Sequence, residues 1–184
     1  MNKALMIIKI FVTVLLGITP LSGQNTVRIG TLLKDIALEA LNRETQYIPD
    51  FGKKPVIVFY TDPESKDFND PVSQAIVDNG FGIELAGLGI INCADTWFPD
   101  AIIRKGAQIK QKQFKGAVML LDRDHYIPRE WNLGDCNNAS VILIVGRDRR
   151  LKYFNKVRSE EESRQAIRDV IKVLSREVKG TVSQ

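Results

Sequence analysis

The two cysteines have the side chains best suited to covalent chemistry. Cys93 ends an apolar run that begins at Gly87, and Cys136 precedes another, Val141 to Val145. If both runs are strands of one sheet, the two thiols lie at the same end of it, where thiol–disulfide exchange would require a thiolate with a lowered pKa. One strand is expected between them, which places them about 10 Å apart and beyond disulfide reach unless the Cys136 loop folds over, in which case an oxidising compartment would let them pair. Divergent thiol chemistry at Cys93 or Cys136 is one hypothesis, and a small buried residue is the other interpretation of Cys93.

Acidic residues gather after the apolar runs, where the carboxyl ends of parallel strands would lie. They are Asp62, Glu64, Asp67, Asp95 and Asp100. Ligands of α/β sheets bind at that end, and Ca²⁺ prefers carboxylate oxygens. The spaced Asp and Gly pattern of a calcium loop is absent, and acidic groups near helix N-termini also act as caps. Helix caps are the simpler interpretation, with a metal site in the acidic loop as an alternative.

The remaining candidates for a functional site are the histidine and several aromatic residues. His125 is the sole histidine, which excludes a catalytic triad and a histidine-rich zinc site, so a surface position is expected. Several aromatic residues could line a groove for a peptide or small ligand, although large aromatics usually seal a core. They are Trp97, Phe98, Tyr126 and Trp131.

Composition indicates one globular domain. The chain has 184 residues, of which 44% are hydrophobic, enough for a core without metal or disulfide support. Lys and Arg total 26 against 22 Asp and Glu, and both signs are scattered along the chain. This pattern argues against nucleic acid as a partner.

The N-terminus predicts export. Residues 1–23 combine Lys3 and Lys9, an apolar stretch from Ile10 to Leu16, and small residues before Gln24. This is typical of a cleaved signal peptide, which would leave residues 24–184 as a single periplasmic or secreted domain without a stable membrane span. The alternative is retention as an anchor, but the uncharged run is short for a span of roughly 20 residues.

The first half of the chain alternates apolar runs with helical patterns. Residues 25–51 are polar and suggest a leading extension or an edge hairpin. Residues 56–60 read as a central strand, Asp70 and Pro71 as the start of a helix that ends near Gly80, and residues 87–95 as the next strand. A helix over about 98–114 would be capped by Asp95 or Thr96. Its predicted core residues are Ile102, Ile103, Ile109 and Phe114.

The second half predicts three more strands and a long final helix. Strands are expected over residues 117–121, 141–145 and 151–157, the last two as an antiparallel hairpin. Ser159 and Glu162 have the spacing of a capping box. The apolar stripe that follows it is Ala166, Ile167, Val170, Ile171, Leu174 and Val178.

This order of elements resembles the thioredoxin-like superfamily, in particular its TlpA and peroxiredoxin-type branch, over residues 30–174. Two sets of motifs carry the resemblance: the lead-in "GTLLKDIALEALNRETQYIPDFGKKPVIVFY", and "IINCADTWFPD" with "LLDRD", a Trp-Asn-Leu segment and a Val-rich strand. The second set is similar to the YtfJ family of exported bacterial thioredoxin-like proteins. The implied fold is a three-layer α/β/α sandwich whose mixed sheet has central parallel strands, a C-terminal hairpin and a terminal helix.

The resemblance also shows what this chain lacks. Redox members carry a Trp-Cys-x-x-Cys unit after the first central strand, where this chain has residues 61–67 without cysteine. They carry a cis-proline before the later antiparallel strand, where this chain has Ala139 and Ser140. The resemblance therefore implies a binding or accessory protein of the cell envelope rather than an enzyme, with an unknown protein or peptide partner and no cofactor. The candidate binding residues are Asp62, Glu64, Asp67, Asp95 and Ser140.

Overall fold

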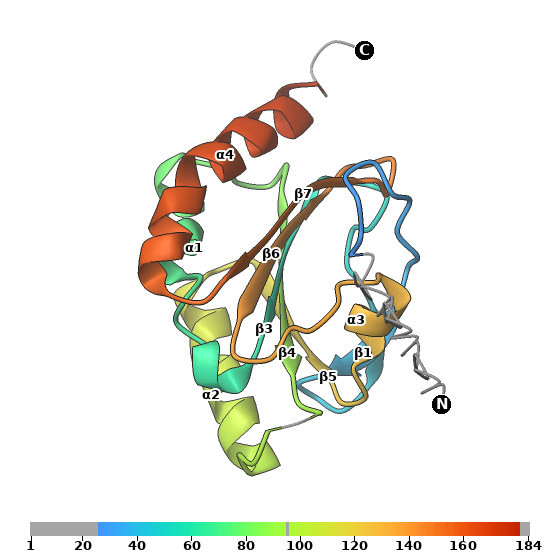
Figure 1. Cartoon of the computed structure of the whole chain (residues 1–184), viewed down its shortest axis with the longest axis vertical. Coiled ribbons are helices and arrows are strands. Elements are labelled where there is room, and N and C mark those ends of the chain that lie inside the picture. Colours follow the sequence, from blue (N-terminus) through green and yellow to red (C-terminus); the bar gives the residue numbers. More distant parts are fainter. Residues whose placement is uncertain (1–25, 95, 181–184) are drawn as a thin grey trace, which may run out of the picture.

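A computed structural model describes residues 26–94 and 96–180 of the chain. The predicted signal peptide and Asp95 lie outside the described residues. Seven strands form a single sheet in the order β2-β1-β5-β4-β3-β6-β7 (Figure 1). The strands are β1 (Ala37–Ala40), β2 (Thr45–Tyr47), β3 (Val56–Thr61), β4 (Ala86–Asn92), β5 (Ala117–Asp122), β6 (Ser140–Val145) and β7 (Leu151–Val157). The helices are η1 (Pro63–Ser65, a 3₁₀ turn), α1 (Asp70–Asp78), α2 (Asp100–Gln113), α3 (Tyr126–Glu130) and α4 (Glu160–Lys179).

The centre of the sheet follows the predicted topology. All six residues of β3 are buried, as expected of a continuous apolar strand covered on both faces. β3 pairs parallel with β4, and β4 pairs parallel with β5. On its other side β3 pairs antiparallel with β6, which forms an antiparallel hairpin with β7. The predicted mixed α/β architecture is confirmed.

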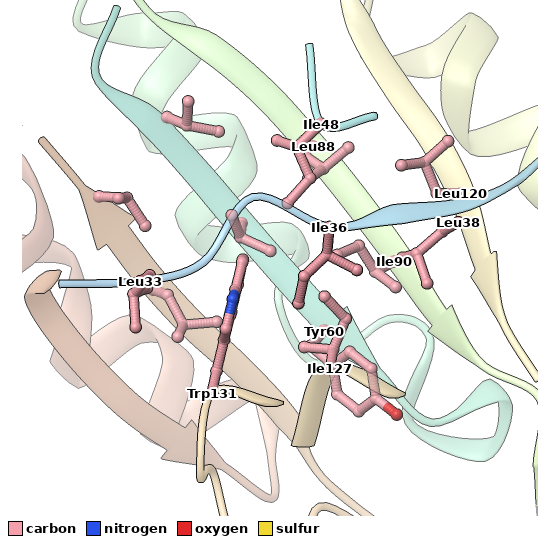
Figure 2. Packing of buried hydrophobic residues seen from close by; sticks show 14 of the residues in the cluster. Leu33, Ile36, Leu38, Ile48, Tyr60, Leu88, Ile90, Leu120, Ile127 and Trp131 are labelled. Atoms are coloured by element: carbon pink, nitrogen blue, oxygen red, sulfur yellow. The ribbon is translucent and has the colours of Figure 1, made fainter. Parts of the chain in front are cut away.

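Helices and loops cover the two faces of the sheet differently. α1, α2 and α4 lie on one face, and α3 and the segment before β3 lie on the other (Figure 1). Under α1 and α4, Ile57 and Phe59 of β3 pack with Val72, Val170 and Leu174. The second core, shown in Figure 2, packs residues of the N-terminal segment against Leu88, Ile90 and Trp131.

The N-terminal segment contains the predicted edge hairpin. β1 pairs antiparallel with β2 and also with the end of β5, so the hairpin extends the sheet beyond its parallel strands. Leu38 and Ala40 alternate with half-buried residues along β1 and face the core. This alternation is what a strand covered on one face requires.

The terminal helix matches its sequence signals. The Ser159 hydroxyl accepts a hydrogen bond from the backbone N–H of Glu162 at 3.2 Å, so Ser159 is the N-cap. The Glu162 carboxylate accepts the backbone N–H of Arg158 at 2.8 Å, one residue before the usual partner in a capping box. Ala166, Val170 and Leu174 are buried along the predicted stripe.

The inward face of α2 differs from the prediction. Ile102 and Ile109 are 57% and 56% exposed, whereas Ile103, Arg104 and Ala107 are buried. The reason is that α2 packs beside β5, toward the hairpin, so the inward face is fixed by tertiary contacts rather than by the longest apolar side chains. Arg104 donates hydrogen bonds to the carbonyl oxygens of Ala40 (3.3 Å) and Leu41 (3.1 Å), and pairs with Glu39 and Asp100.

Helix starts were also misplaced by one or more residues. α2 begins at Asp100 with Pro99 at the N-cap position, and the Thr96 hydroxyl instead accepts the backbone N–H of Phe98 at 3.2 Å. Asn69, rather than Asp70, occupies the N-cap position of α1, and Pro71 lies in the first turn as predicted. Proline fits the first turn of a helix because its φ is already helical. Pro71 therefore marks the start of α1 to within one residue.

Candidate functional site

The corner after β3 is closed by direct hydrogen bonds to the start of β6 and to the loop before it. Thr61 and Ser140 are register partners in the sheet, and their buried hydroxyl oxygens lie 2.8 Å apart. Next along the chain, the backbone N–H of Asp62 donates to the carbonyl of Ala139 at 3.1 Å. The predicted site residue Ser140 is therefore bonded within the sheet.

Asp62 uses both carboxylate oxygens inside this corner. One oxygen accepts the backbone N–H of Glu64 at 2.9 Å, which caps η1, and the other accepts the backbone N–H of Asn138 at 3.1 Å. A carboxylate that accepts backbone donors near a helix start is a stabilising arrangement. Here it ties the β3 corner to the loop between α3 and β6.

The other acidic candidates are paired with cations or donors. The indole N–H of Trp97 donates to Glu64 at 3.0 Å. Asp67 contacts Lys66 and, at 2.9 Å, Lys110, and the hydrogen bond from Lys66 is the main reason that its pKa lies below the usual value. Lys110 also contacts both oxygens of Asp70, at 2.5 and 2.6 Å. The acidic loop thus binds the lysine of α2 that faces it.

Asp100 belongs to a separate ion-pair network. Hydrogen bonds from Arg123, and then from Arg104, lower its pKa to about 2. Both arginines also contact Glu39 of β1. This network fastens the first turn of α2 to the edge hairpin. Within residues 26–94 and 96–180, no group of three or more His, Cys, Asp or Glu side chains is placed to hold a metal ion.

The two cysteines flank β3 at the same end of the sheet, as the topology predicted, but they are not linked. Both thiols are free, Cys93 half-buried and Cys136 buried. Cys93 donates to the carbonyl of Ile91 at 3.4 Å and Cys136 to that of Gly134 at 3.3 Å. Burial raises the pKa of each thiol to about 11. A reactive cysteine requires the opposite shift.

A buried carboxylate close to both thiols was not anticipated from the sequence. Asp122 ends β5 and is fully buried, and it accepts the backbone N–H groups of Tyr126 (2.8 Å) and Ile127 (2.9 Å). Its own carbonyl accepts the N–H of Cys93 at 2.7 Å. Asp122 therefore anchors the start of α3. An aspartate directly after an apolar strand and four residues before a helix was the available signal.

The aromatic candidates separate into two groups, and His125 takes a turn position. Trp131 is buried, stacks on Phe51 with ring centroids 6.1 Å apart, and donates its indole N–H to the Lys34 carbonyl at 2.9 Å. Trp97 is 75% exposed and stacks on Phe98 at 4.4 Å, so these aromatics do not form one groove. His125 is half-buried, with φ 51°, at the N-cap position of α3.

An apolar groove that the sequence reasoning missed lies on the opposite face from Trp131. It has a volume of about 910 Å³ and is lined by α1, α2 and the strands β3, β4 and β5 beneath them. Gly87 and Gly89 of β4 form its floor. The available signal was the alternation in "AGLGII", where one face of a central strand carries glycine and the other carries Leu88 and Ile90.

Comparison with known proteins gives matches in structure alone. No family model matches this sequence, and no curated protein matches it. A hypothetical protein from Sinorhizobium meliloti is 19% identical with a TM-score of 0.64, over 85% of this chain and 87% of that one. A putative thiol:disulfide interchange protein, DsbE, from Chlorobium tepidum is 10% identical with a TM-score of 0.59, over 81% and 99%. A peroxiredoxin-like protein from Aquifex aeolicus is 8% identical with a TM-score of 0.56, over 80% and 88%.

At these identities the matches establish the fold. The sheet order, the parallel central strands and the C-terminal hairpin with its helix are those of a thioredoxin-like fold. The fold by itself leaves activity open, because it is used for many functions. No helix in the described ranges combines the length and apolar character needed to cross a bilayer.

Proposed function

We propose that this chain is an exported binding or accessory protein of the cell envelope that uses a thioredoxin-like fold without dithiol chemistry. Its similarity to the YtfJ family and the signal-like residues 1–23 are parts of this proposal. Structural neighbours include a thiol:disulfide interchange protein and a lipoprotein thioredoxin from Streptococcus pneumoniae, the latter named as exposed, so export is in keeping with the fold.

One observation carries the proposal: the corner where redox relatives place their cysteines is filled by Thr61, bonded to Ser140 at the start of β6, and by Asp62, bonded to the loop before β6. A disulfide exchange site needs an accessible thiolate at a helix start. Here Cys136 is buried and Cys93 is half-buried, and burial raises the pKa of each thiol to about 11, so the thiolate is disfavoured at neutral pH.

The direct test is turnover by the purified chain. We expect no reduction of insulin by dithiothreitol above the uncatalysed rate and no peroxide consumption. The matched control is the double variant Cys93→Ser/Cys136→Ser. Turnover by the wild type that this variant abolishes would overturn the non-catalytic assignment in favour of a divergent thiol enzyme.

A second test measures the thiols themselves. Alkylation by iodoacetamide at pH 8, followed by mass spectrometry, should be slow in the folded chain and fast after denaturation, because burial suppresses the thiolate. Rapid modification of Cys93 in the native protein would contradict the assignment. Export is checked separately by N-terminal sequencing of protein from the envelope fraction, which should begin near Gln24.

The metal alternative has its own measurement. Asp62 and Glu64 accept hydrogen bonds from neighbouring groups and Asp67 is paired with lysines, so their oxygens are engaged without a metal ion. Native mass spectrometry after calcium loading should therefore show no stoichiometric adduct. One calcium ion per chain, lost in an Asp62→Asn variant, would establish the acidic loop as a metal site.

A further inference from the structure

The groove between α1 and α2 has the dimensions of a small-ligand site. Its volume of about 910 Å³ falls within the range of roughly 300–1,000 Å³ that ligand pockets occupy. The floor is low at Gly87, which puts no side chain there and has only Ala117 in van der Waals range. A Cβ atom on Gly89 would meet the Met119 sulfur at 2.5 Å, which shows that Met119 lies across the floor at that point.

Apolar side chains make up most of the walls of this groove between its two charged ends. Ile76 and Phe81 line the α1 side, and Ile103 and Ala107 line the α2 side. At the rim, Ile83 is 84% exposed. Val77, Ile102 and Ile109, which also line the groove, are more than half exposed. Large side chains gathered around a hollow in this way mark a binding surface rather than chance exposure.

The floor offers no hydrogen bonds to an occupant. β4 pairs with β3 along residues 86–91 and with β5 along residues 87–92, so its backbone donors and acceptors are used within the sheet. An extended peptide would bury its own backbone N–H and C=O groups against this floor without partners, which is costly. A hydrocarbon chain has no such groups, and its burial is favourable by about 0.8 kcal/mol per methylene.

The length of the groove sets the length of the hydrocarbon chain that fits in it. Lining residues run from Ile83 and Gly116 at one end of β4 to Asp62 and Phe98 at the other. Seven strand residues at about 3.3 Å each span roughly 20 Å. A sixteen-carbon chain with bonds of about 1.5 Å in zigzag extends over a similar distance.

Charge differs between the two ends. At the end where the strands begin, Lys54 and Lys115 line the groove with a single acid, Asp50, which contacts Lys54 at 3.3 Å. Each lysine lies two residues before its strand, and those strands flank β4. At the far end Lys66 and Lys110 face three lining acids, Asp62, Asp67 and Asp70. The first end therefore favours an anionic head group.

We propose that this groove binds one long-chain fatty acid, with its carboxylate at Lys54 and Lys115 and its hydrocarbon chain running over Gly87 and the Met119 side chain toward Phe98. The inference goes beyond the non-catalytic function proposed above, which would stand if fatty acid failed to bind.

The test is binding of palmitate to the full-length chain, measured by displacement of a fluorescent fatty acid. We expect saturable binding of one molecule per chain. The blocking variant is Gly87→Leu, since a Cβ there would make an ordinary 3.6 Å contact with Ala117 and the side chain would fill the groove. It should weaken binding at least tenfold with an unchanged circular dichroism spectrum. The matched control Ile29→Ser removes an exposed apolar residue outside the groove and should bind as wild type.

The head group is tested with Lys115→Glu against Lys112→Glu, an exposed position on α2 that does not line the groove. Lys115→Glu should weaken palmitate binding by up to about fivefold, the range of an exposed ion pair, and leave hexadecanol binding unchanged. Lys112→Glu should change neither.

Three results would overturn the inference. One is the absence of saturable palmitate binding, and another is equal binding by a folded Gly87→Leu variant. The third is equal affinity for palmitate and hexadecanol with no effect of Lys115→Glu, which would exclude the carboxylate. A wild-type dimer that Gly87→Leu converts to a monomer, without fatty acid binding, would assign the groove to a second copy of the chain instead.

Discussion

The two faces of β4 have opposite character. On one face Leu88 and Ile90 are almost fully buried in the core shown in Figure 2. On the other, Gly87 and Gly89 leave a groove under α1 and α2. Both faces belong to a strand with paired neighbours on either side. The contrast shows that a central strand can complete one core while leaving room for a ligand on its reverse face.

The position of α2 explains why the groove stays open. Arg104 and Asp100 fasten this helix to the β1 edge and to Arg123 after β5. Toward α1 it is joined by Lys110, which contacts Asp67 and Asp70 near the far end of the groove. α2 is thus fixed at both sides by ion pairs, and beneath it Gly87 contributes no side chain to the gap, whereas the Met119 side chain lies over Gly89.

The largest expected effect is on the filled face. Leu88→Ala should lower the free energy of unfolding by about 2–5 kcal/mol, because it opens a cavity in a close-packed core. Urea denaturation monitored by tryptophan fluorescence measures it. A loss below about 1 kcal/mol would mean that this face is not the rigid core described here.

Substitutions at the corner after β3 should lower the free energy of unfolding by a smaller amount. Thr61→Val leaves the Ser140 hydroxyl buried without its 2.8 Å partner and should cost about 1–3 kcal/mol in unfolding free energy. Ser140→Ala should cost a similar amount, and the double variant should cost less than the sum of the two. Additive losses in this double-mutant cycle would show that the two hydroxyls do not interact.

On the groove face of β4, adding a methyl group at Gly87 should raise the free energy of unfolding rather than lower it. Gly87→Ala, with room for its Cβ, should raise the free energy of unfolding by about 0.4–1 kcal/mol through the lower entropy of the unfolded chain. Gly89→Ala is the matched control, because its Cβ requires Met119 to move, and it should gain less or lose stability. Equal effects would contradict the described position of Met119.

The smallest effect concerns the ion pairs that hold α2. The Asp100 pKa is lowered from 3.8 to about 2 by Arg123 and Arg104. A carboxylate whose pKa is lower in the folded than in the unfolded state stabilises the folded protein at pH values above the unfolded-state pKa. This contribution is lost as the pH falls from about 4 toward about 2. The melting temperature of wild type should therefore fall more between pH 5 and pH 2 than that of Asp100→Asn. Asp169→Asn, on the exposed side of α4, is the control and should follow wild type.

Elements with a strong local sequence pattern could be predicted from the sequence. The apolar run of β3, the Ser159 cap and the stripe through Val170 each fix an element by burial or by capping, and the structure confirms them. The inward face of α2 was not predictable, since Ile102 and Ile103 are equally apolar neighbours and Arg104, a charged residue, is buried. Its burial depends on carbonyl groups of residues 40–41, more than 60 positions away in sequence.

The sequence by itself determined the order of the central strands and helices and the absence of cysteine from the β3 corner, because these depend on residue type and short-range spacing, and the resemblance of its motifs implied the thioredoxin-like architecture. Tertiary structure alone decided that Thr61 meets Ser140, that both thiols have a raised pKa, and that a groove lies beneath α1 and α2. Each of these depends on how closely distant segments approach one another, and residue spacing along the chain does not specify that distance.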